Sequence, residues 1–338
     1  MKLIKALAAL TLALSLAACA EDPVPTPSPD PGPAVPEAVI NGEQLEGILA
    51  SVQETLAAAD AESNSEELSG RVTGPAGRLR AAEFALSVIT EEPVPALSTE
   101  PQLAIVAATD GWPRTVMVVT AIPEGENLPL LLTLVQEDPR AHYELRSWVR
   151  LLPGTELPQT VSAAVGSPSV PADSADLLVT PTDVLTQYAD VMNNEDASEY
   201  VASFAADSFR QYVATQVTDL NDAVSDAGEA SMETSAAVDD GVMALETYDG
   251  GAIVVGVLTS DLRVEKTVPR GTLTVGTVLA YGGDATITVD TPLTAHYLTT
   301  IAFYVPPAGS DQLITVLGAE YVLEDVTRGD TAEEEDNE

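Results

Sequence analysis

The sequence predicts an α+β protein made of two tandem units, each with helices followed by a curved antiparallel sheet. Three observations support this prediction. Both halves open with a capped amphipathic helix, both continue with several runs of β-type sequence, and a Pro/Ser/Ala-rich stretch over residues 153–176 separates them. Helices followed by consecutive antiparallel strands are typical of folds in which the helices pack on one face of a sheet.

Residues 1–18 have the pattern of an export signal. Lys2 and Lys5 precede an uncharged stretch over residues 6–18. A helix of that length spans roughly 20 Å, which is too short for a bilayer core of about 30 Å. The pattern therefore indicates a signal peptide that is removed, and not a membrane span.

The segment Leu16-Ala17-Ala18-Cys19 resembles the lipobox of bacterial lipoproteins. The resemblance implies cleavage between Ala18 and Cys19 and a diacylglyceryl group on the Cys19 sulfur. The mature chain would then be lipid-anchored at the extracytoplasmic face of the cell membrane. An ordinary secretory signal with a chance cysteine is the alternative. Because Cys19 is the only cysteine, its lipidation would leave no thiol for disulfides, metal binding or nucleophilic catalysis.

Composition divides the rest of the chain into five parts. Residues 19–38 contain seven prolines and predict an extended stalk of up to roughly 60 Å. A first α+β domain is expected over residues 39–152, a linker over 153–176 and a second α+β domain over 177–327. Residues 328–338 (RGDTAEEEDNE) are expected to form an acidic, disordered tail.

The first helix of each half has a clear start signal. Asn41 and Thr180 are favourable N-cap residues, and Gln44 and Asp183 stand three positions later, as in a capping box. Pro181 fits the first helical position. Further helices are predicted near 75–89 and 197–218, and strands over 103–109, 115–122, 129–136, 141–152, 252–259, 262–268, 272–281, 285–290, 295–305 and 312–326.

The two halves also share a short motif. Ala141-His142-Tyr143 and Ala295-His296-Tyr297 open comparable predicted strands. Together with the similar helix starts, this motif indicates a duplication. The predicted order of elements resembles the NTF2-like (cystatin-like) cone, in which a curved sheet wraps a helix. This resemblance implies a fold and no function.

The whole chain is similar in plan to uncharacterised two-domain actinobacterial lipoproteins that carry a domain of unknown function. Besides the lipobox and the proline stalk, four stretches carry this resemblance: Thr73-Gly74-Pro75-Ala76, Arg80-Ala81-Ala82-Glu83-Phe84, Leu178-Val179-Thr180-Pro181 and Tyr188-Ala189-Asp190-Val191. That group has no assigned activity, so the resemblance implies the layout alone.

The formal net charge of −39 restricts the possible partners. A nucleic acid requires a basic face that displaces counterions, so we expect no nucleic-acid binding. Solubility and self-repulsion explain the charge most simply. The acidic residues are scattered without the spacing of a calcium loop.

No catalytic, cofactor or metal motif is recognisable. Only two histidines are present, and neither accompanies a nucleophile elbow, a H-E-x-x-H motif or paired cysteines. Gly250-Gly251 and Gly282-Gly283 precede strands and indicate hairpin turns, not phosphate loops. We therefore predict no catalytic residues, no cofactor and no metal site.

Three residues are candidates for a binding surface: His142, Trp148 and His296. Alternation along the predicted strand places His142 and Trp148 opposite the apolar Tyr143 and Leu145. Trp148 stands between two arginines, a composition favoured at binding hot spots. The simpler interpretation is an exposed or hydrogen-bonded histidine in each strand and a tryptophan stacked over a partly covered sheet.

Three interpretations of function follow. The first is a non-catalytic envelope lipoprotein that binds a protein, a wall component or a small apolar ligand. The second is a structural spacer or assembly factor, and the third is an enzyme of unfamiliar type. The first requires a lined pocket or an exposed apolar patch, whereas the third requires a histidine, an arginine and carboxylates in one cavity.

Overall fold

The computed structural model describes residues 36–276, 279, 281 and 286–329. The predicted signal peptide, most of the stalk, Ala18, Cys19, Gly282-Gly283 and residues 330–338 lie outside these residues. Four helices and one large, mostly antiparallel sheet of ten strands form the described part, which confirms the α+β class.

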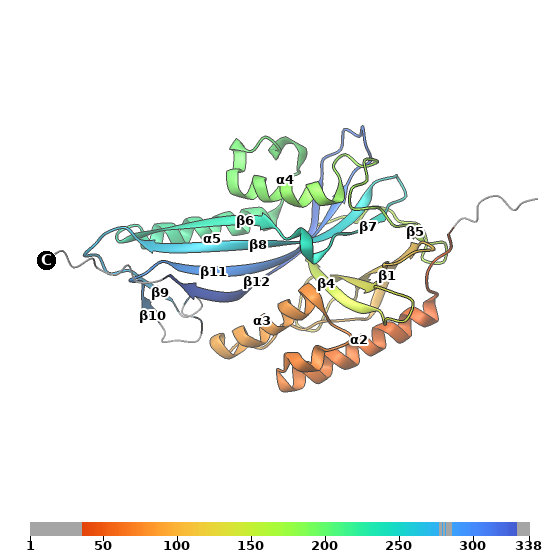
Figure 1. The fold of residues 1–338 in the computed structure, drawn as a ribbon, viewed down its shortest axis with the longest axis horizontal. Helices are drawn as coiled ribbons and strands as arrows, with labels where there is room; N and C mark the ends of the chain where they lie inside the picture. Colours follow the sequence, from red (N-terminus) through yellow and green to blue (C-terminus); the bar gives the residue numbers. More distant parts are fainter. Residues whose placement is uncertain (1–35, 277–278, 280, 282–285, 330–338) are drawn as a thin grey trace, which may run out of the picture. The chain divides into compact units, whose positions relative to one another are not determined.

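The secondary-structure elements follow one another in the order shown in Figure 1. The helices are α2 (Gly42–Glu62), α3 (Gly74–Thr90), α4 (Pro181–Asn194) and α5 (Ser208–Val224), with short 3-10 helices η1 (Ser65–Leu68), η2 (Glu195–Ala197), η3 (Val201–Ser203) and η4 (Val238–Asp240). The strands are β1 (Pro101–Ala108), β2 (Arg114–Thr120), β3 (Leu130–Gln136), β4 (Glu144–Leu151), β5 (Ser167–Pro168), β6 (Gly228–Ala236), β7 (Met243–Glu246), β8 (Ala252–Lys266), β9 (Thr274–Gly276), β10 (Thr286–Thr288), β11 (Leu293–Val305) and β12 (Thr315–Arg328).

The two predicted helix starts are confirmed. The Asn41 side chain accepts a hydrogen bond from the Gln44 backbone N–H, and the Gln44 side chain accepts one from the Asn41 N–H, both at 2.9 Å. Thr180 caps α4 by accepting from the Asp183 N–H at 3.1 Å, with Pro181 in the first turn. These local bonds satisfy backbone donors that the helix itself leaves unpaired.

Ten strands from both halves join in one sheet, and β9 pairs with β10 in a separate two-stranded sheet. The order of the large sheet is β5-β1-β2-β3-β4-β12-β11-β8-β6, with β7 paired to β8. The halves meet where β4 and β12 pair, at Leu151 opposite Gly318 and Arg150 opposite Ala319. A Cβ added at Gly318 would lie 2.6 Å from the Arg150 carbonyl oxygen, so only glycine permits this close approach. The described residues from Glu37 onward form one compact unit, so the structure does not show the two tandem units that the sequence predicts.

The predicted linker takes part in the sheet. Its residues Ser167 and Pro168 form β5, which pairs in parallel with β1. Ser169 then forms a bridge with Leu245 of β7, and the Val170 N–H donates to the Ala244 carbonyl at 3.0 Å. Strands β7, β8, β11, β12, β4, β3, β2, β1 and β5 therefore form a continuous hydrogen-bonded circuit.

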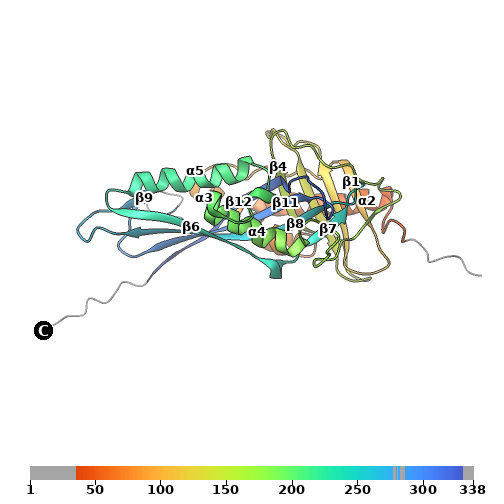
Figure 2. The same ribbon diagram turned by 90° about the horizontal axis from the view of Figure 1, so that it is seen from above.

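Helices cover two different faces of this sheet. In Figure 1, α2 and α3 lie on one side of the strands, and α4 and α5 lie on the other. Figure 2 shows α4 and α5 running over the long strands of the second half, where both contact β6. Apolar residues of α2 and α3 pack on β1–β4, whereas those of α4 pack on β8 and β11. A third core inside the circuit includes Ile105, Met117 and Ile253.

Several predicted boundaries are wrong. The two strands expected over 252–259 and 262–268 are the single strand β8, which pairs along its length with β6 and β7. Both partners lie within residues 221–250, where no strand is predicted from the sequence. The helix expected near 197–218 begins only at Ser208, after an Asp207 cap. The Gly250-Gly251 turn between β7 and β8 is confirmed, with Gly250 at φ +83°.

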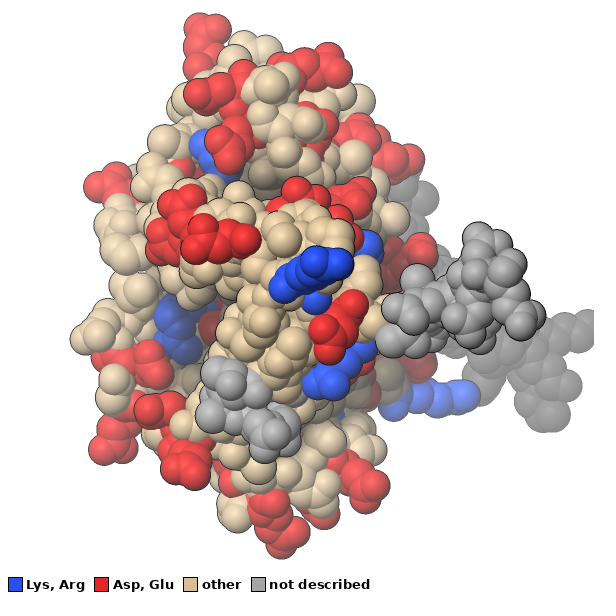
Figure 3. Space-filling model, turned by 90° about the vertical axis from the view of Figure 1, so that its left-hand side faces the viewer, with Lys and Arg blue, Asp and Glu red and all other residues tan. Residues whose placement is uncertain are grey.

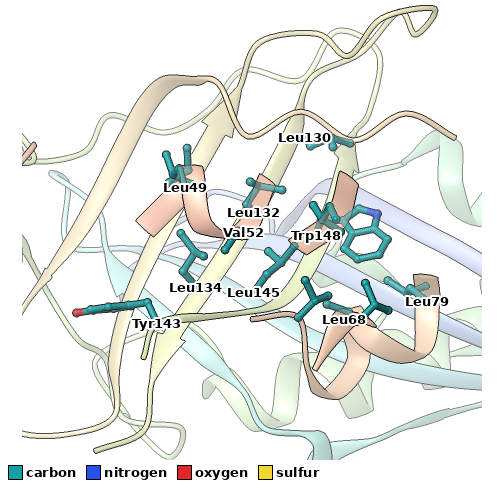
Figure 4. Packing of buried hydrophobic residues seen from close by; sticks show 14 of the residues in the cluster. Leu49, Val52, Leu68, Leu79, Leu130, Leu132, Leu134, Tyr143, Leu145 and Trp148 are labelled. Carbon is teal, nitrogen blue, oxygen red and sulfur yellow. The ribbon is translucent and has the colours of Figure 1, made fainter. Parts of the chain in front are cut away.

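The predicted placement of Trp148 on the face opposite Leu145 is also wrong. Its side chain is fully buried and shares a core with Leu145, as Figure 4 shows. The cause is a β-bulge: Thr133 pairs with Ser147, but Leu134 pairs with Leu145, so Arg146 is an extra residue. An extra residue moves every later side chain to the opposite face. Val149 accordingly lies in the core on the other side of the sheet.

No helix in the described residues is long and apolar enough to cross a membrane.

Candidate functional site

The candidate site is a hollow of about 430 Å³ beside the first turns of α2. Three structural regions line it: the N-terminal part of α2 with the residues just before it, the segment between η1 and α3, and the ends of β2, β3 and β4. The polar groups that face it include Arg71, Arg114, His142 and Tyr143. Of the three sequence-predicted candidates, His142 lines this hollow.

Backbone pairing with β4 holds Arg71 in place. The Leu145 N–H donates to the Arg71 carbonyl at 2.7 Å, and the Thr73 N–H donates to the Leu145 carbonyl at 3.0 Å. The Arg71 guanidinium Nη1 reaches the Tyr143 carbonyl at 3.4 Å. This carbonyl is neutral, so the positive charge of Arg71 remains available to a ligand.

Arg114 is held by stacking on Trp112. Its guanidinium carbon lies 4.2 Å from the centre of the indole ring, and its Nε donates to the Gly111 carbonyl at 3.4 Å. The Trp112 Nε1 in turn donates to Gln136 at 3.4 Å. Cation–π contacts of this kind orient a guanidinium without neutralising it.

The loop that carries His142 is tied to β3. The Gln136 Nε2 donates to the Ala141 carbonyl at 2.9 Å, and His142 follows as an exposed residue. His142 therefore precedes β4, whose first residue is Glu144, and the predicted strand over 141–152 began too early.

Tyr143 offers a hydroxyl without a partner. Its oxygen is buried and forms no hydrogen bond with the described residues, and Figure 4 shows it directed away from the labelled core side chains. Burial raises the pKa of Tyr143 to about 12, against the opposing charge of Arg114. The phenol therefore keeps its proton at neutral pH and can donate it to an acceptor in a hydrogen bond.

The charge of the hollow is opposite to that of the chain. Carboxylates are spread over the surface shown in Figure 3, and the formal net charge is −39. Yet no Asp or Glu side chain lines the hollow, and no described carboxylate lies within salt-bridge distance of Arg71 or Arg114. Two guanidiniums without a carboxylate partner form a suitable set of donors for an anion.

The other two candidates lie elsewhere. Trp148 is enclosed in the core. His296 lies on β11, where its Nδ1 is 2.7 Å from Asp261 Oδ1 on β8 and its Nε2 is 2.9 Å from Thr327 Oγ1 on β12. Both ring nitrogens of His296 thus bond to neighbouring strands, and the structure does not bring the two histidines together.

No group of three His, Cys, Asp or Glu side chains in the described residues is arranged to hold a metal ion. The hollow combines a histidine with arginines but lacks the carboxylates that we required for an enzyme. Sequence analysis missed Arg71, Arg114 and Tyr143. The one available signal was the rarity of basic residues, 14 Lys and Arg against 53 Asp and Glu.

Comparison with known proteins gives one match. Residues 36–325 match the model of a family described as "Domain of unknown function (DUF8094)". No curated protein and no solved structure matches the chain.

Proposed function

Because the chain belongs to the DUF8094 family, which carries no assigned activity, we propose a function from the geometry: a non-catalytic binding protein that holds a small anion in the hollow. The observation that supports this proposal is the convergence of Arg71 and Arg114 on one hollow that no carboxylate lines. The anion would carry a carboxylate or a phosphate, since both accept hydrogen bonds from paired guanidinium groups.

Titration calorimetry of the full chain with inorganic phosphate and with malonate tests this proposal and separates the two anion classes. We expect at least one of them to bind. Replacing Arg71 or Arg114 with alanine should weaken that binding about tenfold or more, because a hydrogen bond to a charged group contributes roughly 1.5–3 kcal/mol.

Arg140→Ala is the matched control. Arg140 is exposed on the loop that leads to His142 but does not line the hollow, so its loss changes the net charge equally without removing a ligand contact. Failure of both anions to bind would contradict the proposal. So would an equal loss of affinity in Arg140→Ala, which would indicate a general effect of charge.

We also propose that the protein works at the extracytoplasmic face of a cell membrane, held there by lipid on Cys19. The lipobox residues and the uncharged stretch before them support this proposal. Labelled palmitate should enter the native chain and not the Cys19→Ser variant. In that variant the chain should no longer sediment with membranes, and unchanged sedimentation would contradict the anchor.

The arrangement of strands supports the proposal that the halves arose by duplication of an NTF2-like unit. Two helices occur on each side of the β4–β12 junction, together with four sheet positions when the short strands β5 and β7 are left aside. Exchanging β4 with β12, β3 with β11, β2 with β8 and β1 with β6 preserves the sheet order. The motif shared by 141–143 and 295–297 does not follow this correspondence, because it relates the fourth strand position of one half to the third of the other.

A further inference from the structure

A second cavity, of about 290 Å³, lies between the C-terminal half of α3 and strand β12. Most of its wall is apolar or uncharged. The residues that form this wall include Leu86, Thr90, Pro93, Pro95 and Val322. Three carboxylates, Glu83, Glu92 and Glu320, also line the cavity. We call it the α3–β12 groove. Its volume is at the low end for small-molecule sites, so only a small molecule would fit in it.

Two arginines beside this groove are shared among four carboxylates. Arg80 contacts Asp60 and Glu83, each at 2.6 Å. Arg150 contacts Glu126 at 3.1 Å, but its nearest approach to Glu320 is 3.7 Å. If all six groups are ionised, the cluster carries two uncompensated negative charges. The buried end of the cluster therefore requires a third positive group or a bound proton.

The uncompensated negative charge of this cluster lies at Glu320. Its Oε2 is buried and forms no hydrogen bond with the described residues, and 3.7 Å from a guanidinium nitrogen is too long for one. Burial raises the pKa of Glu320 to about 7; Arg150 opposes the rise, whereas Glu83 and Glu126 add to it. Near neutral pH this carboxyl is divided between a protonated form and a form that requires a cation.

We propose that the α3–β12 groove binds a primary ammonium group carried on a small apolar body, with the ammonium donating to the carboxylate of Glu320. The apolar body lies against Leu86, Pro93 and Val322. The ammonium then supplies one of the two missing positive charges, and the wall removes the apolar body from water. This site is separate from the anion-binding hollow, since the two share no lining residue.

Calorimetry with n-hexylamine as the probe tests the proposal on the full chain. At pH 8 we expect saturable binding to one site, and 1-hexanol, which has the same apolar body without the charge, should bind at least about tenfold more weakly. Glu320→Gln should reduce hexylamine affinity about tenfold or more while leaving 1-hexanol unchanged.

The pH dependence provides a second readout. An alkylamine stays charged at pH 6 and pH 8, but Glu320 is protonated in most molecules at pH 6. Hexylamine should therefore bind about tenfold more weakly at pH 6 and should release a proton on binding, which calorimetry in two buffers of different ionisation enthalpy measures. Glu83 and Arg150, which face Glu320 from α3 and β4, act on it at both pH values.

Glu324→Gln is the matched control, because Glu324 lies on the same strand but pairs with Arg78 outside the groove. It should leave hexylamine binding unchanged. Absence of hexylamine binding, equal binding of 1-hexanol, or equal losses in Glu320→Gln and Glu324→Gln would each overturn the proposal. Phosphate and malonate binding should be the same in Glu320→Gln as in the unmodified chain, which keeps this test separate from that of the hollow.

Discussion

Replacing Arg80 with alanine is expected to lower the free energy of unfolding by about 3–5 kcal/mol, the range for breaking a buried ion pair. The Arg80 side chain is 1% exposed and that of Glu83 is 6% exposed. Arg80 also donates to the Pro95 carbonyl at 2.8 Å and lies 5.4 Å from the Phe84 ring. Without Arg80, Glu83 would be a buried carboxylate whose remaining neighbouring cation, Arg150, lies beyond salt-bridge distance. Urea denaturation at pH 7 measures the change.

Arg78 is the matched control for Arg80. It lies on the same helix and also binds two carboxylates, Asp240 and Glu324, at 3.0 and 2.6 Å. Its side chain is 39% exposed, so water screens these pairs and Arg78→Ala should cost at most about 1 kcal/mol. Equal losses for the two variants would contradict the argument from burial.

A double variant separates the ion pair from the packing. In Arg80→Met with Glu83→Leu, neither charge of this buried ion pair is left, and apolar side chains fill the space. Such replacements are often neutral or stabilising, so most of the stability lost in Arg80→Ala should return. A double variant as unstable as Arg80→Ala would mean that the loss comes from packing and not from the unpaired carboxylate.

Glu320→Gln is expected to stabilise the protein at pH 8 by roughly 3 kcal/mol and to have little effect at pH 4. The pKa of Glu320 is about 7 in the folded chain, against an ordinary value of 4.5. Between these pH values the folded chain holds a proton that the unfolded chain has released. Its free energy of unfolding therefore falls as pH rises, by about 1.4 kcal/mol per pH unit, until the folded pKa is passed. Glutamine imitates the neutral carboxyl at every pH.

Denaturation curves of the two proteins at pH 4, 6 and 8 measure this difference. The gap should open between pH 4 and pH 8, with the unmodified chain less stable at the higher pH. Glu324→Gln should show no such gap in favour of the variant, because Glu324 binds Arg78 in a half-exposed position. A gap that is already complete at pH 4, or a Glu320→Gln variant that is less stable at pH 8, would contradict the raised pKa.

The sequence predicted features that depend on neighbouring residues. The Asn41–Gln44 capping box and the Thr180 cap need side chains only three positions apart, so their physics is contained in a short segment. The class of fold followed from such elements. The pairing of β4 with β12 could not be predicted, because it joins Arg150 to Ala319 and no local pattern specifies which distant edges meet.

The misplacement of Trp148 shows a different limit. Strict alternation assumes one residue per step, and a single extra residue at Arg146 exchanges the faces of the strand beyond it. The sequence around Arg146 contains no Gly or Pro to mark the bulge. The groove carboxylate Glu320 escaped notice because many carboxylates occur, and only burial distinguishes it from the rest.

The hollow could be predicted only in part. His142 was identified because histidines are rare, whereas Arg71, Arg114 and Tyr143 come from three separate segments of the first half. Their convergence depends on the bridge between Val72 and Leu145 and on the stacking of Arg114 over Trp112. The bridge joins residues far apart in the sequence and forms only after the sheet is assembled, whereas Trp112 and Arg114 are only two positions apart.

The central position of β12 constrains how the molecule is built. This strand is the final element of the described chain, yet it lies between β4 and β11. During synthesis, β4 and β11 each have one unpaired edge until the region after Thr315 is available. Unpaired edges are templates for association between chains, and pairings so distant in sequence form slowly. Assembly therefore ends in the middle of the molecule, and the growing chain needs protection from aggregation until that final step.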